Sequence, residues 1–462
     1  MLFNSVEFVL FLCSVLVVFY AMPRRVRPLF LLAASYYFYA YWNVKFLALL
    51  IAITLADYGG AIAMTRLSST TARRGFLAVC VSLNLAVLGA LKYLAPAYKG
   101  LHALTGFPEP AFVSAIILPI GISFHTFQSI SYLVDVYRGV QPAIRSLPHY
   151  ALYIAFFPQL VAGPIVRARN FFPELTPWKG PTQLDVLRAL FLMALGFFKK
   201  MVMADNLGLV ADSYFSDPSQ HPGVLGALSG SLAFSFQIYF DFSGYSDIAI
   251  GVALLFGFHF PENFRRPYLS ASVTEFWRRW HMSLSSWLRD YVYIPLGGNR
   301  NGTVALYRNL LLTMMIGGIW HGANWTFAVW GLYHGLLLAV ERFGAGFVPA
   351  PGPLTRPIRV VGTFILVSLG WILFRAADMR LAGIVVGQLF SAETGLGLIP
   401  TWQLVLIFLA GLLSVADERF NLEKRIVESH AVFYGLVIAL LLFGIELLSQ
   451  TDKTLPFDYF QF

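Results

Sequence analysis

Long apolar runs alternate with short polar loops along this chain, a pattern that predicts membrane-spanning helices. In the first third of the sequence the apolar runs cover roughly residues 6–22, 28–44, 46–65, 75–95 and 112–137. A helix needs about 20 apolar residues to cross a bilayer. A chain of 462 residues therefore has room for about ten or eleven spans plus connecting helices. The pattern predicts an all-helical, polytopic membrane protein.

Glycine or proline interrupts several apolar runs at positions that would otherwise lie inside a span. The clearest breaks are at Pro119–Gly121, Phe157–Gln159 and Ala162–Pro164. Such breaks are tolerated at membrane depth only where the freed backbone is buried in protein or lines a water-filled cavity. We therefore expect re-entrant helices around a pocket. Because no polar stretch is long enough for a separate domain, residues 1–462 are expected to form a single transmembrane domain.

Composition and charge agree with a membrane protein and exclude nucleic-acid binding. Only 12% of the residues are charged, against roughly 25% in soluble domains. The net charge of +9 gathers in loops such as Arg24–Arg27, Arg66–Arg74 and Arg138–Arg145. Basic loops stay in the cytoplasm, which places the N-terminus outside. The first apolar run has no cleavage site and is expected to remain as a span.

His321 is an ionisable side chain between two apolar segments, Leu310–Ile316 and Phe327–Val340. Residues 309–340 would be about 48 Å long as one straight helix, which exceeds a hydrocarbon core of about 30 Å. We expect this helix to be broken, with Gly317–Asn324 as the break. Ionisable groups at membrane depth mark reaction sites or relays, and histidine suits proton removal near neutral pH. The alternative is a structural histidine bonded to a neighbouring helix.

The segment 262–300 is predicted to lie along the cytoplasmic face of the membrane. Ser272 and Glu275 have the spacing of a capping box and predict a helix from Ser272 to Arg289. An aromatic stripe opposite a basic stripe is typical of an interfacial helix. The basic residues are expected either to bind lipid phosphates or to hold the phosphates of an acyl donor. The aromatic stripe is Phe276, Trp280, Leu284 and Trp287, and the other face carries Arg278, His281, Ser285 and Arg289.

Other polar residues in apolar runs admit both structural and chemical interpretations. His334 follows His321 by thirteen positions and points to another helical face, so we interpret it as structural or supporting. Asn324 could orient His321 or cap a helix. Neither cysteine, Cys13 or Cys80, belongs to a metal-ligand spacing. Four aspartates could bind an ion in a transporter or link helices by hydrogen bonds, namely Asp57, Asp135, Asp241 and Asp247.

Five further motifs give the chain a resemblance to the membrane-bound O-acyltransferase family, in its bacterial polysaccharide-acetylating branch. The resemblance runs essentially from end to end and includes the segment Gly318–Thr326 around His321. The other motifs are Gly121–Gln128, Phe156–Arg167, Tyr239–Asp247, Pro261–Tyr268 and the long stretch Phe276–Arg300, and the ending Asp458–Phe462 is also similar.

The resemblance implies a ring of transmembrane helices pierced by a tunnel, with the histidine midway. His321 then corresponds to the catalytic position and His281 to the second family histidine. Arg278, Arg279 and Arg289 are expected at the donor mouth. The donor is expected to be acetyl-CoA, used as a substrate, with no permanently bound cofactor or metal. A periplasmic SGNH-type acetyltransferase is the implied protein partner, beside membrane lipids and a polysaccharide acceptor.

The sequence thus predicts an acyltransferase of the bacterial inner membrane with a periplasmic N-terminus. Its expected task is the O-acetylation of an exported polysaccharide such as alginate. One alternative is D-alanyl transfer to teichoic acid from a carrier protein. A second alternative, from a different class, is a transporter or flippase, which would depend on Asp57 or Asp135 rather than on His321.

Overall fold

The computed structural model describes residues 1–108, 110–114, 116–161, 163–344, 346 and 352–449. Every regular element among these residues is helical, and none of them forms a strand. The chain divides into two compact units. Unit 1 comprises Met1–Ala189 and Ala249–Pro261; unit 2 comprises Leu190–Ile248 and the described residues from Glu262 onward.

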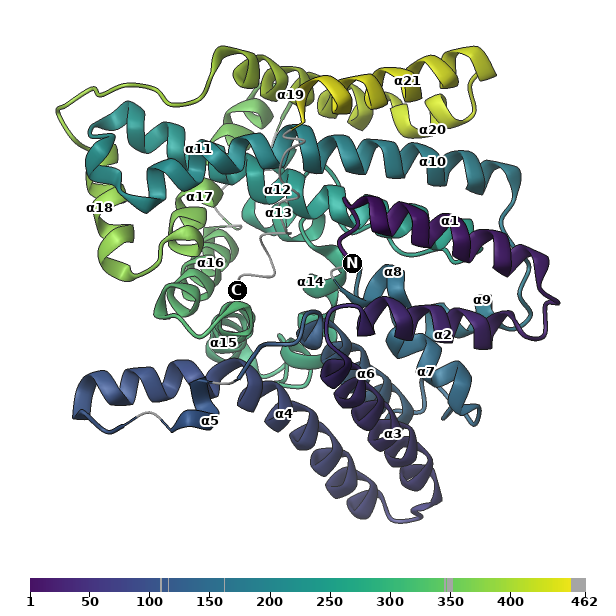
Figure 1. The fold of residues 1–462 in the computed structure, drawn as a ribbon. Helices are drawn as coiled ribbons and strands as arrows, with labels where there is room; N and C mark the ends of the chain where they lie inside the picture. The colour runs from purple at the N-terminus through teal and green to yellow at the C-terminus, as the bar shows by residue number, and fades with distance from the viewer. Residues whose placement is uncertain (109, 115, 162, 345, 347–351, 450–462) are drawn as a thin grey trace. The chain divides into compact units, whose positions relative to one another are not determined.

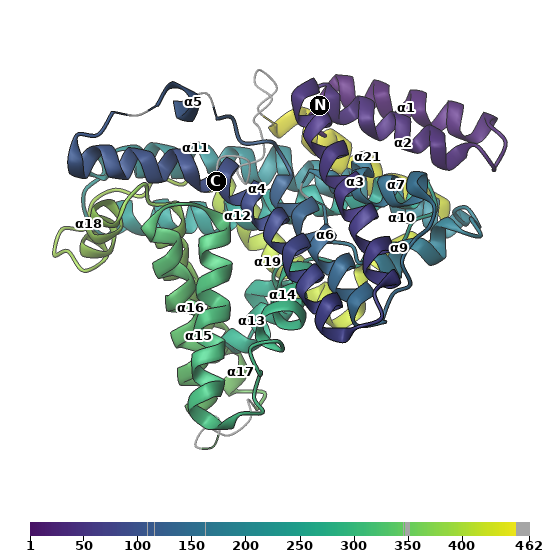
Figure 2. The same ribbon diagram turned by 90° about the horizontal axis from the view of Figure 1, so that it is seen from below.

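Unit 1 contains a group of three helices, α3, α4 and α6, that lie side by side (Figures 1 and 2). Asn84 of α4 donates to Asp57 Oδ1 of α3 at 2.7 Å, so this buried aspartate links two helices. The helices of unit 1 are α1 Val6–Ala21, α2 Arg27–Ala40, α3 Val44–Arg66, α4 Thr70–Thr105, α5 Ala111–Ser114, α6 Ile122–Tyr137, α7 Leu147–Ala155, α8 Phe157–Leu160 and α9 Ala168–Leu175.

The predicted helix break at Pro119–Gly121 coincides with a close backbone contact, whereas the one predicted at Phe157–Gln159 lies one residue too late, inside α8 Phe157–Leu160. Gly121 has φ 75° and directly precedes α6, and a Cβ there would lie 2.2 Å from Leu160 O. The span expected over 112–137 therefore begins only at Ile122. A second break separates α7 from α8 beside Phe156. Ala162, in the third expected break, and the ending 458–462 lie outside the described residues.

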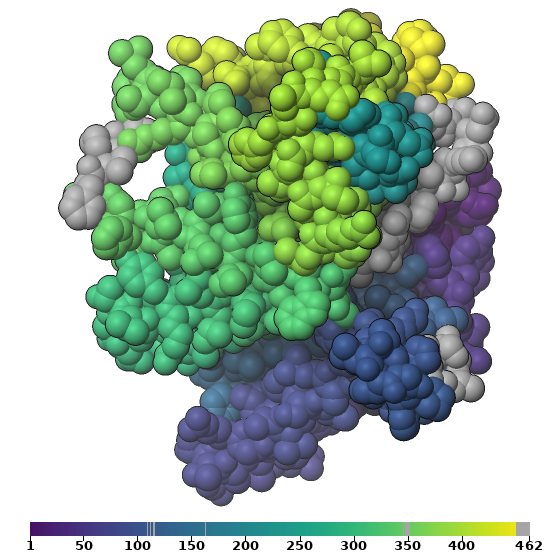
Figure 3. Space-filling model, turned by 90° about the vertical axis from the view of Figure 1, so that its left-hand side faces the viewer, coloured from purple at the N-terminus to yellow at the C-terminus, as the bar shows by residue number. Residues whose placement is uncertain are grey.

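In unit 2, α15, α16 and α17 pack one against the next (Figures 1 and 3). Two helices, α10 Gln183–Phe197 and α12 Val224–Leu255, pass from one unit into the other. The remaining helices of unit 2 are η1 Phe198–Ala204, α11 Asp205–Ser216, η2 Pro218–Gln220, η3 Pro267–Leu269, α13 Val273–Arg279, α14 Met282–Leu288, η4 Arg289–Tyr293, α15 Gly302–His321, α16 Trp325–Gly344, α17 Thr355–Arg375, α18 Met379–Leu389, α19 Thr401–Phe420, α20 Leu422–Val427 and α21 Ala431–Leu448.

The element η1 is a π-helix whose two adjacent lysines both form ion pairs with α12. Lys199 Nζ lies 2.6 Å from Asp247 Oδ2, and Lys200 Nζ lies 2.7 Å from Asp241 Oδ1. Asp205, at the start of α11, is also 2.8 Å from Lys200 Nζ. Charges buried at membrane depth need such partners. Asp241 and Asp247 therefore join helices, as one of the two interpretations of the sequence proposed.

Seven of the described helices are long and apolar enough to cross a membrane. This is fewer than the ten or eleven estimated from chain length, because apolar helices such as α1, with 16 residues, and α18, with 11, are shorter. The polytopic, all-helical class is confirmed, whereas the central tunnel stays a prediction. The seven helices are α3, α4, α12, α15, α17, α19 and α21.

Candidate functional site

Helix α15, which ends at His321, and the next helix, α16, pack with their backbones in direct contact. A Cβ added at Gly318 would lie 2.2 Å from the carbonyl oxygen of Phe327. One added at Gly331 would lie 2.4 Å from the carbonyl oxygen of Met314. Small residues at helix interfaces allow this approach in membrane proteins. The two glycines therefore fix the position of the last turn of α15, to which His321 belongs.

His321 is the last residue of α15, and α16 begins at Trp325. The interruption lies inside the expected break, Gly317–Asn324. Asn324 Oδ1 accepts from the backbone N–H of Thr326 at 3.2 Å, the contact of a residue that caps a helix start. The Asn324 amide also donates to the carbonyl of Ala377. Asn324 thus caps α16, which decides between the two roles that the sequence left open.

Aromatic rings enclose the His321 imidazole, which is 4% exposed. The ring centroids of Trp320, Phe374 and Trp330 lie 4.8, 5.0 and 5.2 Å from that of His321. The Trp330 and Phe374 rings meet the imidazole edge to face. These contacts restrict rotation of the side chain and surround it with apolar surface.

His334 packs against one of the same tryptophans. Its ring centroid lies 5.0 Å from that of Trp330 and 5.3 Å from that of Trp277 of α13. The side chain is fully buried, and neither ring nitrogen has a hydrogen-bond partner within the described part of the chain. His334 therefore contributes a ring to the aromatic cluster behind His321.

The segment that carries His281 starts as predicted but does not continue as one helix. Ser272 Oγ accepts from the Glu275 backbone N–H at 3.1 Å, so the N-terminal cap of α13 is confirmed. The prediction of a continuous helix to Arg289 is wrong, because α13 ends at Arg279 and α14 starts at Met282. His281, between them, has φ 40°, a left-handed conformation that cannot continue an α-helix.

Asn263 holds the backbone and the side chain of this break. The Asn263 carbonyl accepts from the Met282 backbone N–H at 2.9 Å. Its side-chain Oδ1 lies 3.2 Å from His281 Nδ1 and accepts from Ser283 Oγ at 2.9 Å. His281 is 1% exposed, and burial lowers its pKa to about 3. The ring is therefore neutral near pH 7. Sequence reasoning missed Asn263, although it lies within the motif Pro261–Tyr268.

The three predicted donor-binding arginines have different surroundings. Arg279 pairs with Glu275 and with Glu418 at 2.8 Å each, and the hydrogen bond with Glu418 raises the pKa of Arg279. Arg289 is 64% exposed and pairs with the adjacent Asp290 at 2.8 Å. Arg278 is exposed, and no carboxylate of the described residues pairs with it.

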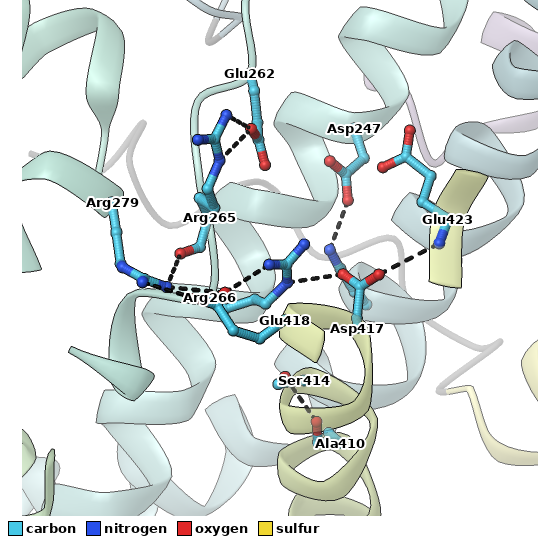
Figure 4. A network of polar contacts seen from close by, with 11 residues as sticks. Asp247, Glu262, Arg265, Arg266, Arg279, Ala410, Ser414, Asp417, Glu418 and Glu423 are labelled. Atoms are coloured by element: carbon cyan, nitrogen blue, oxygen red, sulfur yellow. Dashed lines mark hydrogen bonds and ion pairs between the residues drawn. The ribbon is translucent and has the colours of Figure 1, made fainter. Parts of the chain in front are cut away.

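Carboxylates at the end of α19 bind Arg279 together with a second arginine, Arg266 (Figure 4). Arg266 Nε lies 2.7 Å from Asp417, and its NH1 group lies 2.6 Å from Glu418. Glu418 thus bridges Arg266 and Arg279. The network fastens α13 and the loop before it to α19. Among the three predicted arginines, Arg278 is the one that pairs with no carboxylate of the described residues.

The two predicted catalytic histidines belong to one aromatic cluster in unit 2. Each ring in it contacts the next, with centroid separations between 4.8 and 6.3 Å. The rings come from the loop before η3, the break between α13 and α14, and helices α17, α16 and α15. The order of rings is His281, Phe264, Trp280, Trp371, Trp330 and His321.

Comparison with known proteins assigns a chemistry to this architecture. A protein named probable alginate O-acetylase, from Azotobacter vinelandii, is 47% identical over 85% of this chain and 78% of its own length. A peptidoglycan O-acetyltransferase of Helicobacter pylori is 38% identical over 79% and 73%. A teichoic acid D-alanyltransferase of Bacillus subtilis is 30% identical over 55% and 68%.

The family model for membrane-bound O-acyltransferases matches residues 34–379. That range contains the capped break, both predicted catalytic histidines and all three predicted donor-binding arginines. The multi-pass helical architecture is that of the same family. This chain is therefore an acyltransferase and belongs to the membrane-bound O-acyltransferase family.

Proposed function

We propose that this enzyme transfers an acetyl group from acetyl-CoA in the O-acetylation of an exported polysaccharide such as alginate. Two relatives named for O-acetylation, of alginate and of peptidoglycan, support the choice of acyl group and acceptor class. The D-alanyl alternative has weaker support, since the teichoic acid relative matches only 55% of this chain.

The observation that carries the proposal is the position of His321. A buried imidazole at a capped break between two tightly packed helices has a fixed place and little freedom to rotate. In the proposed reaction His321 takes the proton of the acceptor hydroxyl while the hydroxyl oxygen attacks the thioester carbonyl. The C–S bond then breaks, and the imidazolium returns the proton to the departing thiolate. No metal or covalent enzyme intermediate is required.

His281 and the arginines would serve the donor. Neutral His281 offers a hydrogen-bond acceptor to the reacting groups. Guanidinium groups recognise phosphate, and exposed Arg278 would contribute most because Arg279 already holds two carboxylates. Arg289, 64% exposed, could exchange Asp290 for a phosphate.

The cellular setting follows from the sequence pattern. Basic loops on one side favour an inner-membrane protein with a periplasmic N-terminus and a donor site in the cytoplasm. An SGNH-type periplasmic acetyltransferase is proposed as the partner that completes transfer to the polysaccharide.

Purified enzyme in liposomes tests the proposal, with acetyl-CoA or a D-alanyl carrier protein as the donor and with isolated polysaccharide plus the SGNH-type partner on the acceptor side. We expect acetyl transfer, and we expect His321→Ala to reduce it about 10²–10⁴-fold. His334→Ala, the matched buried histidine, should lower thermal stability but retain activity per folded molecule. Full activity of His321→Ala would disprove the base assignment, and transfer of D-alanine alone would replace the proposed donor.

A further inference from the structure

Asn263 is a buried amide that connects α12 to the helix break at His281. It is 1% exposed, and its Nδ2 donates to Ser246 Oγ of α12 at 3.1 Å. On the other side, its Oδ1 lies 3.2 Å from His281 Nδ1. A single side chain therefore contacts both the membrane-spanning helix α12 and the imidazole.

The orientation of the Asn263 amide is determined by a backbone group. The backbone N–H of Ser283 points at Oδ1 at 3.2 Å, and the Ser283 hydroxyl donates to the same atom at 2.9 Å. A backbone N–H can only donate, so the amide atom facing it must be the oxygen. An amide oxygen can only accept. The Ser283 hydroxyl also lies 3.5 Å from His281 Nδ1, but its single proton is donated to the closer Oδ1. The His281 nitrogen beside that oxygen, Nδ1, therefore carries the proton.

The second nitrogen of His281 follows from the first. A neutral imidazole has one proton, and with that proton on Nδ1 the lone pair belongs to Nε2. Burial keeps the ring neutral. Phe242 and Phe264 lie 4.6 and 6.3 Å from the imidazole, centroid to centroid, and hinder a ring flip that would exchange the nitrogens. The arrangement presents a hydrogen-bond acceptor at Nε2.

We propose that Asn263 is a positioning residue that fixes the tautomer of His281, so that Nε2 can accept a hydrogen bond from a substrate hydroxyl or thiol. This role rests on the proposed function, in which His281 serves the reacting groups. Asn263 also stabilises the left-handed backbone of His281, because its carbonyl accepts a hydrogen bond from the N–H of the next residue, Met282. Asn263 thus sets the position of the ring and the location of its proton.

Nitrogen-15 NMR of histidine-labelled enzyme in lipid bilayers tests the tautomer without reference to activity. His281→Gln identifies the His281 signals by their loss. In the wild type we expect a neutral ring protonated at Nδ1. Asn263→Asp should keep this form, because a carboxylate also accepts, whereas Asn263→Ala should shift population toward the Nε2-protonated form. Asn206→Ala removes another buried asparagine of unit 2 and should leave the signal unchanged. An Nε2-protonated ring in the wild type would overturn the proposal.

A double-mutant cycle tests the consequence for catalysis. Asn263→Ala should lower kcat roughly 10- to 100-fold, the same range as the loss of a residue that orients a metal-binding histidine. In a His281→Ala background the same change should have less than about a twofold effect, because non-additivity identifies residues that act through each other. Equal losses in both backgrounds would overturn the positioning role and leave the base role of His321 intact. A wild-type kcat for His281→Ala would overturn it too, by removing His281 from the reaction.

Discussion

The two predicted catalytic histidines of unit 2, His281 and His321, are immobilised in different ways. His281 is held by hydrogen bonds, through Asn263 Oδ1 on its Nδ1 atom. His321 is enclosed by ring contacts with Trp320, Trp330 and Phe374. A hydrogen bond selects which nitrogen carries the proton, whereas ring contacts restrict how far the imidazole can turn. The two histidines are therefore positioned by different kinds of contact.

The backbone conformations at the two histidines are also stabilised by different kinds of contact. His321 ends a regular helix whose position depends on glycine contacts between α15 and α16. His281 adopts a left-handed conformation held by polar contacts. Tight helix packing therefore supports one histidine, and local hydrogen bonding supports the other.

Adding a methyl group at Gly318 should disrupt the helix packing that positions His321. Its Cβ would lie 2.2 Å from Phe327 O, so α15 and α16 would have to separate. Overpacking of this kind costs about 1–3 kcal/mol or more. We expect Gly318→Ala to lower the melting temperature in detergent and to reduce acyl transfer. Gly362→Ala in α17, where a Cβ meets nothing within 4 Å, should be harmless. Wild-type behaviour of Gly318→Ala would show that close helix contact is not needed at His321.

Removing Arg278 or Arg279 should separate donor binding from structural stabilisation in the segment that carries His281. Arg278→Ala should raise the apparent KM for acetyl-CoA about tenfold, because a hydrogen bond to a charged group contributes at least about 1.5 kcal/mol. The effect should weaken with added salt. Arg279→Ala breaks contacts with Glu275 and Glu418 and should lower stability more than donor affinity. Steady-state kinetics and thermal unfolding of both variants measure the difference. An unchanged KM for Arg278→Ala would indicate a lipid-binding role.

The pH dependence of stability provides the smallest and most local test. Native His281 stays neutral down to about pH 3, while an unfolded histidine takes up a proton below about pH 6.5. The unfolded state therefore binds more protons below pH 6.5, and His281 makes stability fall as the pH drops. The slope is at most about 1.4 kcal/mol per pH unit. His281→Gln should flatten the melting-temperature profile between about pH 6.5 and 4.5. An unchanged profile would contradict a neutral, buried ring.

The helices of the first third were largely predictable because their signals are local. The expected spans 6–22, 28–44 and 46–65 correspond to α1, α2 and α3 within a few residues. The prediction for 112–137 started ten residues too early. Apolar composition continues through Pro119–Gly121, and only the contact of Gly121 with the backbone at Leu160 shows where the helix begins.

The candidate site was predictable as a set of residues but not as an arrangement. The break after His321 followed from helix length and from the glycines around it. The break at His281 did not, because its cause, Asn263, lies eighteen positions away. The partner of Arg279, Glu418, is 139 positions away. Hydrophobic periodicity does not report contacts between residues so far apart in the sequence, so it predicted a continuous helix and could not show that Arg279 pairs with Glu418.

The π-helix η1 has a consequence for insertions and deletions. Adjacent residues of an α-helix point about 100° apart, yet Lys199 and Lys200 both reach α12, at Asp247 and Asp241. A π-helix holds more residues per turn than an α-helix, so adjacent side chains point in slightly closer directions. Deleting one residue from 198–204 would turn the residues on one side of the deletion by about 100° relative to the other side. A deletion here therefore changes how the two lysines face Asp241 and Asp247, whereas a substitution elsewhere in the segment leaves their spacing unchanged.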